Sequence, residues 1–138
     1  MAAFQSPNNS GSASTGALFA HLAAAGLVGA AGVALAAVAA HRVESPALAT
    51  AATMLMIHAA AAVGLLAVSA TLGARAWRWI AALMLGAVAL FSGTIAANTM
   101  SAFSAPVILA PVGGSLLIAS WLAVAVLALI EWRRGGAA

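Results

Sequence analysis

The stretch GLVGAAGVALAA (residues 26–37) contains only glycine, alanine, valine and leucine. It lies within an apolar run of residues 17–40, which at about 1.5 Å per residue is long enough to cross a hydrocarbon core of about 30 Å. Gly26, Gly29 and Gly32 recur at three-residue spacing. In lipid, small residues let helix backbones approach closely, and this packing replaces hydrophobic burial as the cause of association. The stretch therefore predicts a tightly packed membrane-spanning helix.

The composition of the whole chain agrees with this interpretation. Of its 138 residues, 65% are hydrophobic and 5% are charged, and the mean hydropathy is +1.13. A water-soluble domain has about 25% charged residues, so this chain cannot cover a surface that faces water. Lipid must surround most of it, and we expect an all-α integral membrane protein.

Three further apolar runs follow the first. Pro46, Gly73 and the segment SAFSAPVILAP (101–111) separate them, since proline and glycine interrupt helices. The sequence thus predicts an antiparallel four-helix transmembrane bundle within residues 17–133, between a flexible polar tail (1–16) and a short tail (134–138). The expected spans are residues 17–40, 47–72, 77–100 and 112–132.

The arginines predict the orientation of the bundle. With four spans, one side of the membrane carries four arginines and the other side carries only Arg42, beside Glu44. Cytoplasmic flanks are enriched in basic residues, so both termini are expected in the cytoplasm, as for a multi-pass protein of the bacterial inner membrane. Tryptophans next to the arginines favour the same headgroup region. The arginine-rich side contains Arg75, Arg78, Arg133 and Arg134, with Trp77, Trp79 and Trp132 beside them.

The excess of basic over acidic residues does not indicate a nucleic-acid partner. The arginines flank apolar runs and form no basic stripe with interleaved aromatic residues. The chain has no cysteine, which excludes disulfides, thiolate metal sites and thiol nucleophiles. The expected partners are the lipid bilayer and other membrane-protein subunits.

The three histidines lie at three different depths. His21 is near the cytoplasmic edge of the first span, His41 is at its opposite end, and His58 is in the middle of the second span. A bis-histidine haem needs two imidazoles at one level, and a zinc site needs several ligands close together. We therefore expect no metal and no cofactor.

Two other polar side chains share the expected depth of His58. Ser92 lies in the third span and Trp121 in the fourth, so the three side chains form a candidate belt. Polar groups within a span are functional candidates until a structural use is found. Two interpretations remain open: a hydrogen-bonded cluster that fixes helix register, or a site that binds a ligand or handles a proton.

The segment PVGG (111–114) is the second candidate feature. It predicts a turn that packs against the outer end of the bundle; an anion site at the helix start is the alternative. Pro111, Gly113 and Gly114, together with His41 and Arg42, are the candidate outer-loop contacts. There is no pair of buried carboxylates and no GxSxG or SxxK motif, so no enzymatic activity is expected.

The order of short motifs resembles a known family. The segments AAH (39–41), IHA (57–59), LFSGT (90–94), PVGG (111–114) and SW (120–121) follow one another as in the domain of unknown function 423, or transmembrane protein 256-like, family. The resemblance implies a four-span inner-membrane protein and no particular activity. The residues that it marks are His41, His58, Ser92, Gly93, Pro111, Gly113, Gly114 and Trp121.

Two functions follow from these observations. The first is a small non-enzymatic integral membrane protein that serves as an accessory or scaffold subunit of a larger membrane complex. The second is a transporter-like or binding protein that uses the belt of His58, Ser92 and Trp121 for a quinone, a lipid or a proton.

Overall fold

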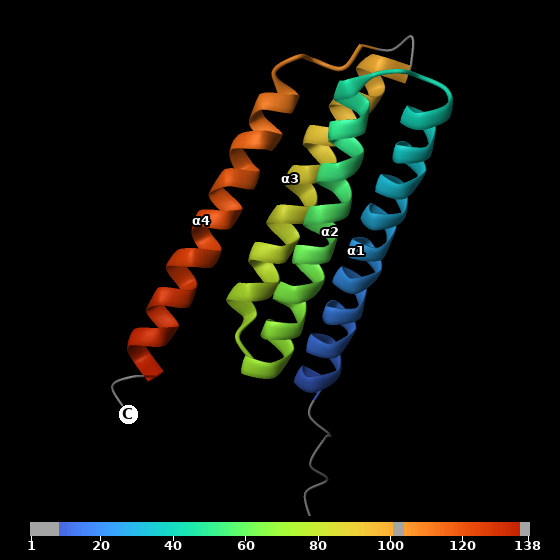
Figure 1. Cartoon of the computed structure of the whole chain (residues 1–138). Helices are drawn as coiled ribbons and strands as arrows, with labels where there is room; N and C mark the ends of the chain where they lie inside the picture. Colours follow the sequence, from blue (N-terminus) through green and yellow to red (C-terminus); the bar gives the residue numbers. More distant parts are fainter. Residues whose placement is uncertain (1–8, 101–103, 136–138) are drawn as a thin grey trace, which may run out of the picture.

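The computed structural model describes residues 9–100 and 104–135, and within these ranges the regular structure is entirely α-helical. Successive helices run in opposite directions (Figure 1). Each is long and apolar enough to cross a membrane. The predicted all-α four-helix membrane bundle is thus confirmed. The helices are α1 (Asn9–His41), α2 (Pro46–Leu72), α3 (Arg75–Met100) and α4 (Leu109–Gly135).

The boundaries of α2 follow from local capping. Ser45 has an extended backbone and its hydroxyl accepts a hydrogen bond from the Leu48 amide at 3.3 Å, while Pro46 occupies the first turn. Proline suits this position because the amide it lacks would have no partner within the helix. At the other end, Gly73 adopts a left-handed conformation with φ of 66°. Such a residue stops the helix and lets the chain turn into α3.

Helices α1 and α4 are longer than predicted. α1 begins at Asn9, so residues 9–16 of the predicted flexible tail are helical. Extending a formed helix is easy, since each added residue gains one hydrogen bond. Residues 1–8 of that tail lie outside the described residues. α4 begins three residues early because Pro111 is tolerated in a first turn, and it continues to Gly135, into the predicted short tail.

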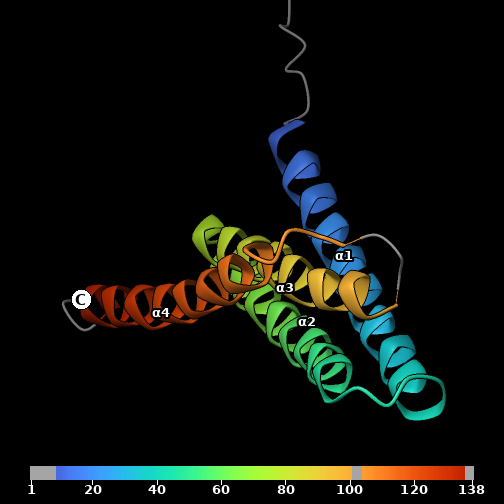
Figure 2. The same ribbon diagram turned by 90° about the horizontal axis from the view of Figure 1, so that it is seen from above.

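The four helices form an open arrangement. α1 packs on α2, α2 on α3 and α3 on α4; α1 also touches α3, while the described parts of α1 and α4 do not approach each other. Figure 2 shows α1 and α4 extending from the central pair in different directions. About 39% of the span of α2 and of α3 is buried, against 11% for α1 and 17% for α4. The edges of the bundle are therefore available to lipid or to other proteins.

The two ends of the bundle differ in charge. The start of α1, the α2–α3 connection and the end of α4 lie at one end (Figure 1), which we call the arginine end because it carries Arg75, Arg78, Arg133 and Arg134. The α1–α2 connection and the start of α4 lie at the other end, which we call the Arg42 end.

Glycine allows α1 to pack closely on α2. A Cβ atom added to Gly32 would lie 2.8 Å from the Met56 Cγ and 3.1 Å from the Ala52 carbonyl oxygen. A Cβ atom on Gly29 would lie 3.5 Å from that of Ala59, whereas on Gly26 it would meet nothing within 4 Å. Two of the three regularly spaced glycines thus face α2, and Gly26 faces outward.

A still closer approach joins α3 to α4. A Cβ atom on Gly113 would lie 2.6 Å from the backbone nitrogen of Phe91 and 2.9 Å from the carbonyl oxygen of Ala87. Gly113 therefore lies directly on the backbone of α3. The PVGG segment belongs to the first turns of α4, and its glycine is a helix-packing residue.

This contact predicts different effects for two neighbouring substitutions. Gly113→Ala should lower the free energy of unfolding by about 1–3 kcal/mol, because backbone atoms of α3 must move to admit the methyl group. Gly114→Ala is the matched control, since its Cβ atom would lie 3.7 Å from the nearest atom of the Phe91 ring, an ordinary contact. Equilibrium unfolding in mixed micelles, followed by circular dichroism, measures both. Equal losses of stability would contradict the close approach at Gly113.

Candidate functional site

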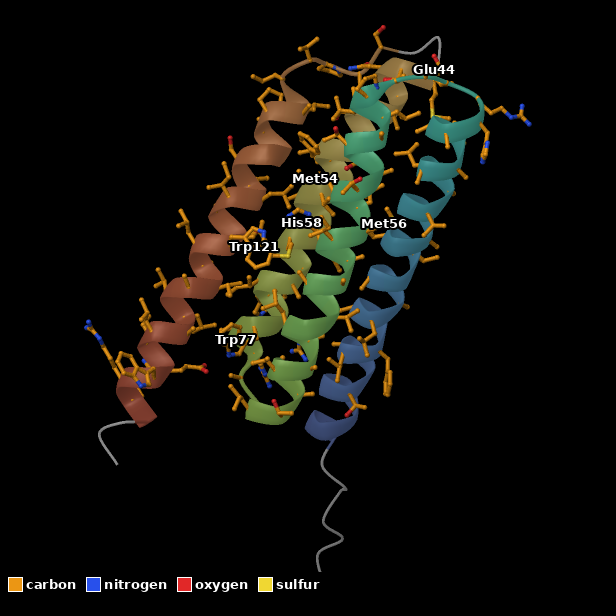
Figure 3. The ribbon with its side chains drawn as sticks, viewed as in Figure 1. Glu44, Met54, Met56, His58, Trp77 and Trp121 are labelled. Carbon is orange, nitrogen blue, oxygen red and sulfur yellow. The ribbon has the colours of Figure 1, made fainter. Side chains whose placement is uncertain are left out.

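His58 is a buried histidine whose two ring nitrogens both have partners within the chain. It lies in the middle of α2 with 6% of its surface exposed (Figure 3). Its Nδ1 is 2.8 Å from the Met54 carbonyl oxygen, and its Nε2 is 3.3 Å from the Trp121 Nε1. An indole N–H can only donate, so the Nε2 of His58 must accept and its Nδ1 must carry the proton. The geometry thus fits a neutral imidazole with one donor and one acceptor.

Trp121 connects helices whose backbones lie apart. The described parts of α2 and α4 make no close backbone approach, yet the indole of Trp121 reaches from α4 to His58 (Figure 3). The two rings meet edge to face, with centroids 6.2 Å apart and an interplanar angle of 63°. Such a contact fixes both the depth and the rotation of α4 relative to α2.

Ser92 is not part of this pair. It is fully buried, and its hydroxyl donates a hydrogen bond to the Ala51 carbonyl oxygen on α2 at 3.0 Å. Ala51 precedes His58 by seven residues, or about 10 Å along the helix axis. The structure therefore brings His58 and Trp121 together and places Ser92 nearer the Arg42 end, where it joins α3 to α2.

A groove lies between α1 and α3 with α2 as its floor, and Ser92 borders it. Its volume is about 360 Å³. The hydroxyl of Ser92 already donates to Ala51, and the other lining residues have only apolar side chains or none, so the groove suits an apolar guest. The lining residues are Leu27, Val28, Ala31, Leu35, Leu55, Ala89, Ser92, Gly93 and Ala96.

A second indole contact was not predicted from the sequence. Trp77 was expected at the headgroup level; it is 6% exposed, and its Nε1 donates to the Glu131 carboxylate on α4 at 3.1 Å. The available signal was depth, since Trp77 lies in the first turn of α3 and Glu131 lies near the end of α4, at the same end of the bundle. α4 is therefore bound by indole hydrogen bonds at two levels, to α2 through Trp121 and to α3 through Trp77.

The candidate outer-loop contacts fall into two separate groups. His41 and Arg42 are exposed at the end of α1, whereas Pro111 is exposed in the first turn of α4. These helices do not approach each other within their described lengths, so the two groups do not form a common site. Gly113 and Gly114 pack against Phe91. Among residues 9–100 and 104–135, no three histidine, aspartate or glutamate side chains gather where a metal ion could bind.

These features define a small multi-pass membrane protein whose polar side chains connect its helices. The sequence model of the family described as "Protein of unknown function (DUF423)" matches residues 28–114, and the chain belongs to this family, as the resemblance predicted. The matched segment includes His58, Ser92 and PVGG and ends before Trp121. Among curated proteins and among solved structures, none matches the chain.

The contact between His58 and Trp121 predicts an energetic coupling. In a double-mutant cycle with His58→Ala and Trp121→Phe, we expect a coupling of about 0.6 kcal/mol, the average for hydrogen bonds between membrane helices, and at most about 1.7 kcal/mol. Phenylalanine keeps an aromatic ring and removes the N–H donor. Trp132→Phe is the control, because Trp132 is 74% exposed. A coupling of zero would show that this hydrogen bond does not hold α4 on α2.

Proposed function

We propose that this protein is a non-enzymatic accessory or scaffold subunit that binds other membrane proteins through the outward faces of its helices. The observation that carries the proposal is a set of glycines within the spans that no contact inside the chain requires. A Cβ atom on any of them would meet nothing within 4 Å. They are Gly26, Gly64, Gly86 and Gly93, all exposed.

The cost of these glycines supports an external use. A glycine within a helix is less favourable than alanine by about 1 kcal/mol. At Gly32 and Gly113 a close contact between two helices offsets this cost, because no side chain fits there. At an outward position, a glycine permits the same close contact with a helix of another protein. The sparse burial of α1 and α4 leaves room for such helices.

The hydrogen bonds of His58 also favour a structural role. Both of its ring nitrogens are used in hydrogen bonds within the chain. The described buried side-chain nitrogen and oxygen atoms all have hydrogen-bond partners. A proton-handling role at His58 would have to break its bond to Trp121 or its bond to Met54. The proposal therefore assigns His58 to fixing helix register.

The proposed location is the bacterial inner membrane, with both termini in the cytoplasm. Four arginines lie at the arginine end of the bundle and a single arginine, Arg42, at the other. This asymmetry supports the orientation, since basic residues are enriched on cytoplasmic flanks.

The proposal is tested by purifying the full chain from native membranes in mild detergent and quantifying co-purifying proteins by mass spectrometry. Gly26→Leu should lower the yield of a specific partner several-fold without lowering stability, because the added side chain projects away from the chain's own helices. Val33→Leu on α1 is the control, since Val33 is already large and 60% exposed. A lone monodisperse protein, or an unchanged partner yield in Gly26→Leu, would count against this function.

The groove between α1 and α3 supports a second candidate, the binding of a lipid or quinone tail. Its volume of about 360 Å³ lies within the range of small-molecule sites, about 300–1,000 Å³. The lining is almost wholly apolar. This candidate differs from the belt expected from the sequence, because the groove includes Ser92 but neither His58 nor Trp121.

Filling the groove tests the second candidate. Gly93→Leu places a side chain in the groove, and Gly86→Leu on the same helix adds the same side chain outside it. We expect Gly93→Leu to reduce a specific co-purified lipid or quinone several-fold, measured by mass spectrometry of the extract, and Gly86→Leu to leave it unchanged. The same amount of the molecule in both variants would exclude the groove as its site.

A further inference from the structure

Arginines from two different helices lie at one end of the bundle. Arg75 and Arg78 are in the first turn of α3, and Arg133 and Arg134 are in the last turn of α4. Three of them are exposed and Arg78 is half-buried. We call these four residues the arginine surface. The only acidic residue at this end is Glu131, because the other acid of the chain, Glu44, precedes α2 at the opposite end.

The bond between Trp77 and Glu131 connects the two helices that carry the four arginines. The Trp77 Nε1 lies 3.1 Å from the Glu131 carboxylate, so these two long side chains bridge the first turn of α3 and the end of α4. Arg78 directly follows Trp77, and Arg133 follows Glu131 by two residues. The arginine end of the bundle carries a formal charge of four arginines against one glutamate.

Local helix stability does not explain all of these arginines. Arg133 and Arg134 lie at the C-terminus of α4, where the helix dipole favours a cation. Arg75 and Arg78 lie at the N-terminus of α3, where the dipole is positive and opposes a cation. The helix dipole of α3 and the charges of its two arginines thus both make the electrostatic potential at this end of the bundle more positive. A bound anion would lower the energy of this arrangement.

We infer that the arginine surface binds the phosphates of anionic phospholipids in the leaflet at this end. The guanidinium group matches phosphate with two parallel hydrogen bonds, and basic pockets between membrane helices bind anionic headgroups. Trp79 and Trp132 are 66% and 74% exposed beside these arginines, as is typical of side chains at headgroup level. Farther into the membrane, α4 exposes apolar residues along which acyl chains lie: Val126, Leu129 and Ile130.

The Arg42 end supplies an internal comparison. Its single arginine, Arg42, lies two residues from Glu44, and both side chains are exposed. The charges on this connection are balanced, so no preference for an anionic headgroup is expected there. Arg42→Gln is therefore a matched control for loss of one arginine.

The test uses the purified full chain in detergent micelles that contain phosphatidylglycerol or phosphatidylcholine with the same acyl chains. Native mass spectrometry measures the lipid retained. We expect the wild-type chain to retain more phosphatidylglycerol, and each of Arg75→Gln and Arg133→Gln to lower this preference about fivefold. Arg42→Gln should leave it unchanged. Micelles have no sidedness, so altered membrane orientation does not contribute, and circular dichroism verifies that the helices are intact.

Several outcomes would overturn the inference. Equal retention of the two lipids by the wild-type chain would exclude a preference for an anionic headgroup. An equal loss in Arg42→Gln would indicate a response to net charge and no site on the arginine surface. If inorganic phosphate at the lipid's own concentration abolished the preference, the site would bind free anions and not lipid.

Discussion

The close approach of α4 to α3 at Gly113 is the contact on which the arrangement of the fourth helix depends. Its backbone lies so near that of Phe91 that a single added methyl group would collide with the peptide nitrogen. Helices in lipid gain no hydrophobic free energy from association, so dispersion contacts at such distances must hold them together. Trp121 and Glu131 can reach their partners only because this contact places α4 on α3. The two indole hydrogen bonds then fix the rest of its length.

The same constraint explains why depth was predictable from the sequence and contacts were not. Span positions follow from length and composition, and the Ser45–Pro46 start and Gly73 end of α2 follow from local chemistry. In a soluble helix, an apolar stripe identifies the buried face. Here the face toward lipid is as apolar as the face toward other helices, so the rotation of each helix is not encoded in its pattern. Depth alone grouped Ser92 with His58 and Trp121, but Ser92 bonds to Ala51.

The burial of Trp77 was not predicted from the sequence for a related reason. An indole near a membrane boundary suits the headgroup region, and Trp79 and Trp132 are exposed as this expectation requires. Trp77 is buried because its position on α3 turns its ring into the hydrophobic core, and its N–H reaches Glu131 from there. Its neighbours in sequence give no sign of this difference, since all three tryptophans adjoin an arginine. The packing of the helices, which sets the face that each tryptophan occupies, distinguishes them.

Packing and charge at the arginine end are linked through the bond between Trp77 and Glu131. That bond connects the end of α4 to the start of α3, and each helix carries two arginines at this end, whose positive charges repel one another. Glu131 offsets part of this repulsion, but it cannot balance four arginines. On the proposed lipid site, an anionic headgroup would supply the missing negative charge, and a ligand that binds only the folded form stabilises it. The position of α4 would then depend on membrane composition as well as on the chain's own contacts, most strongly at the end farthest from Gly113.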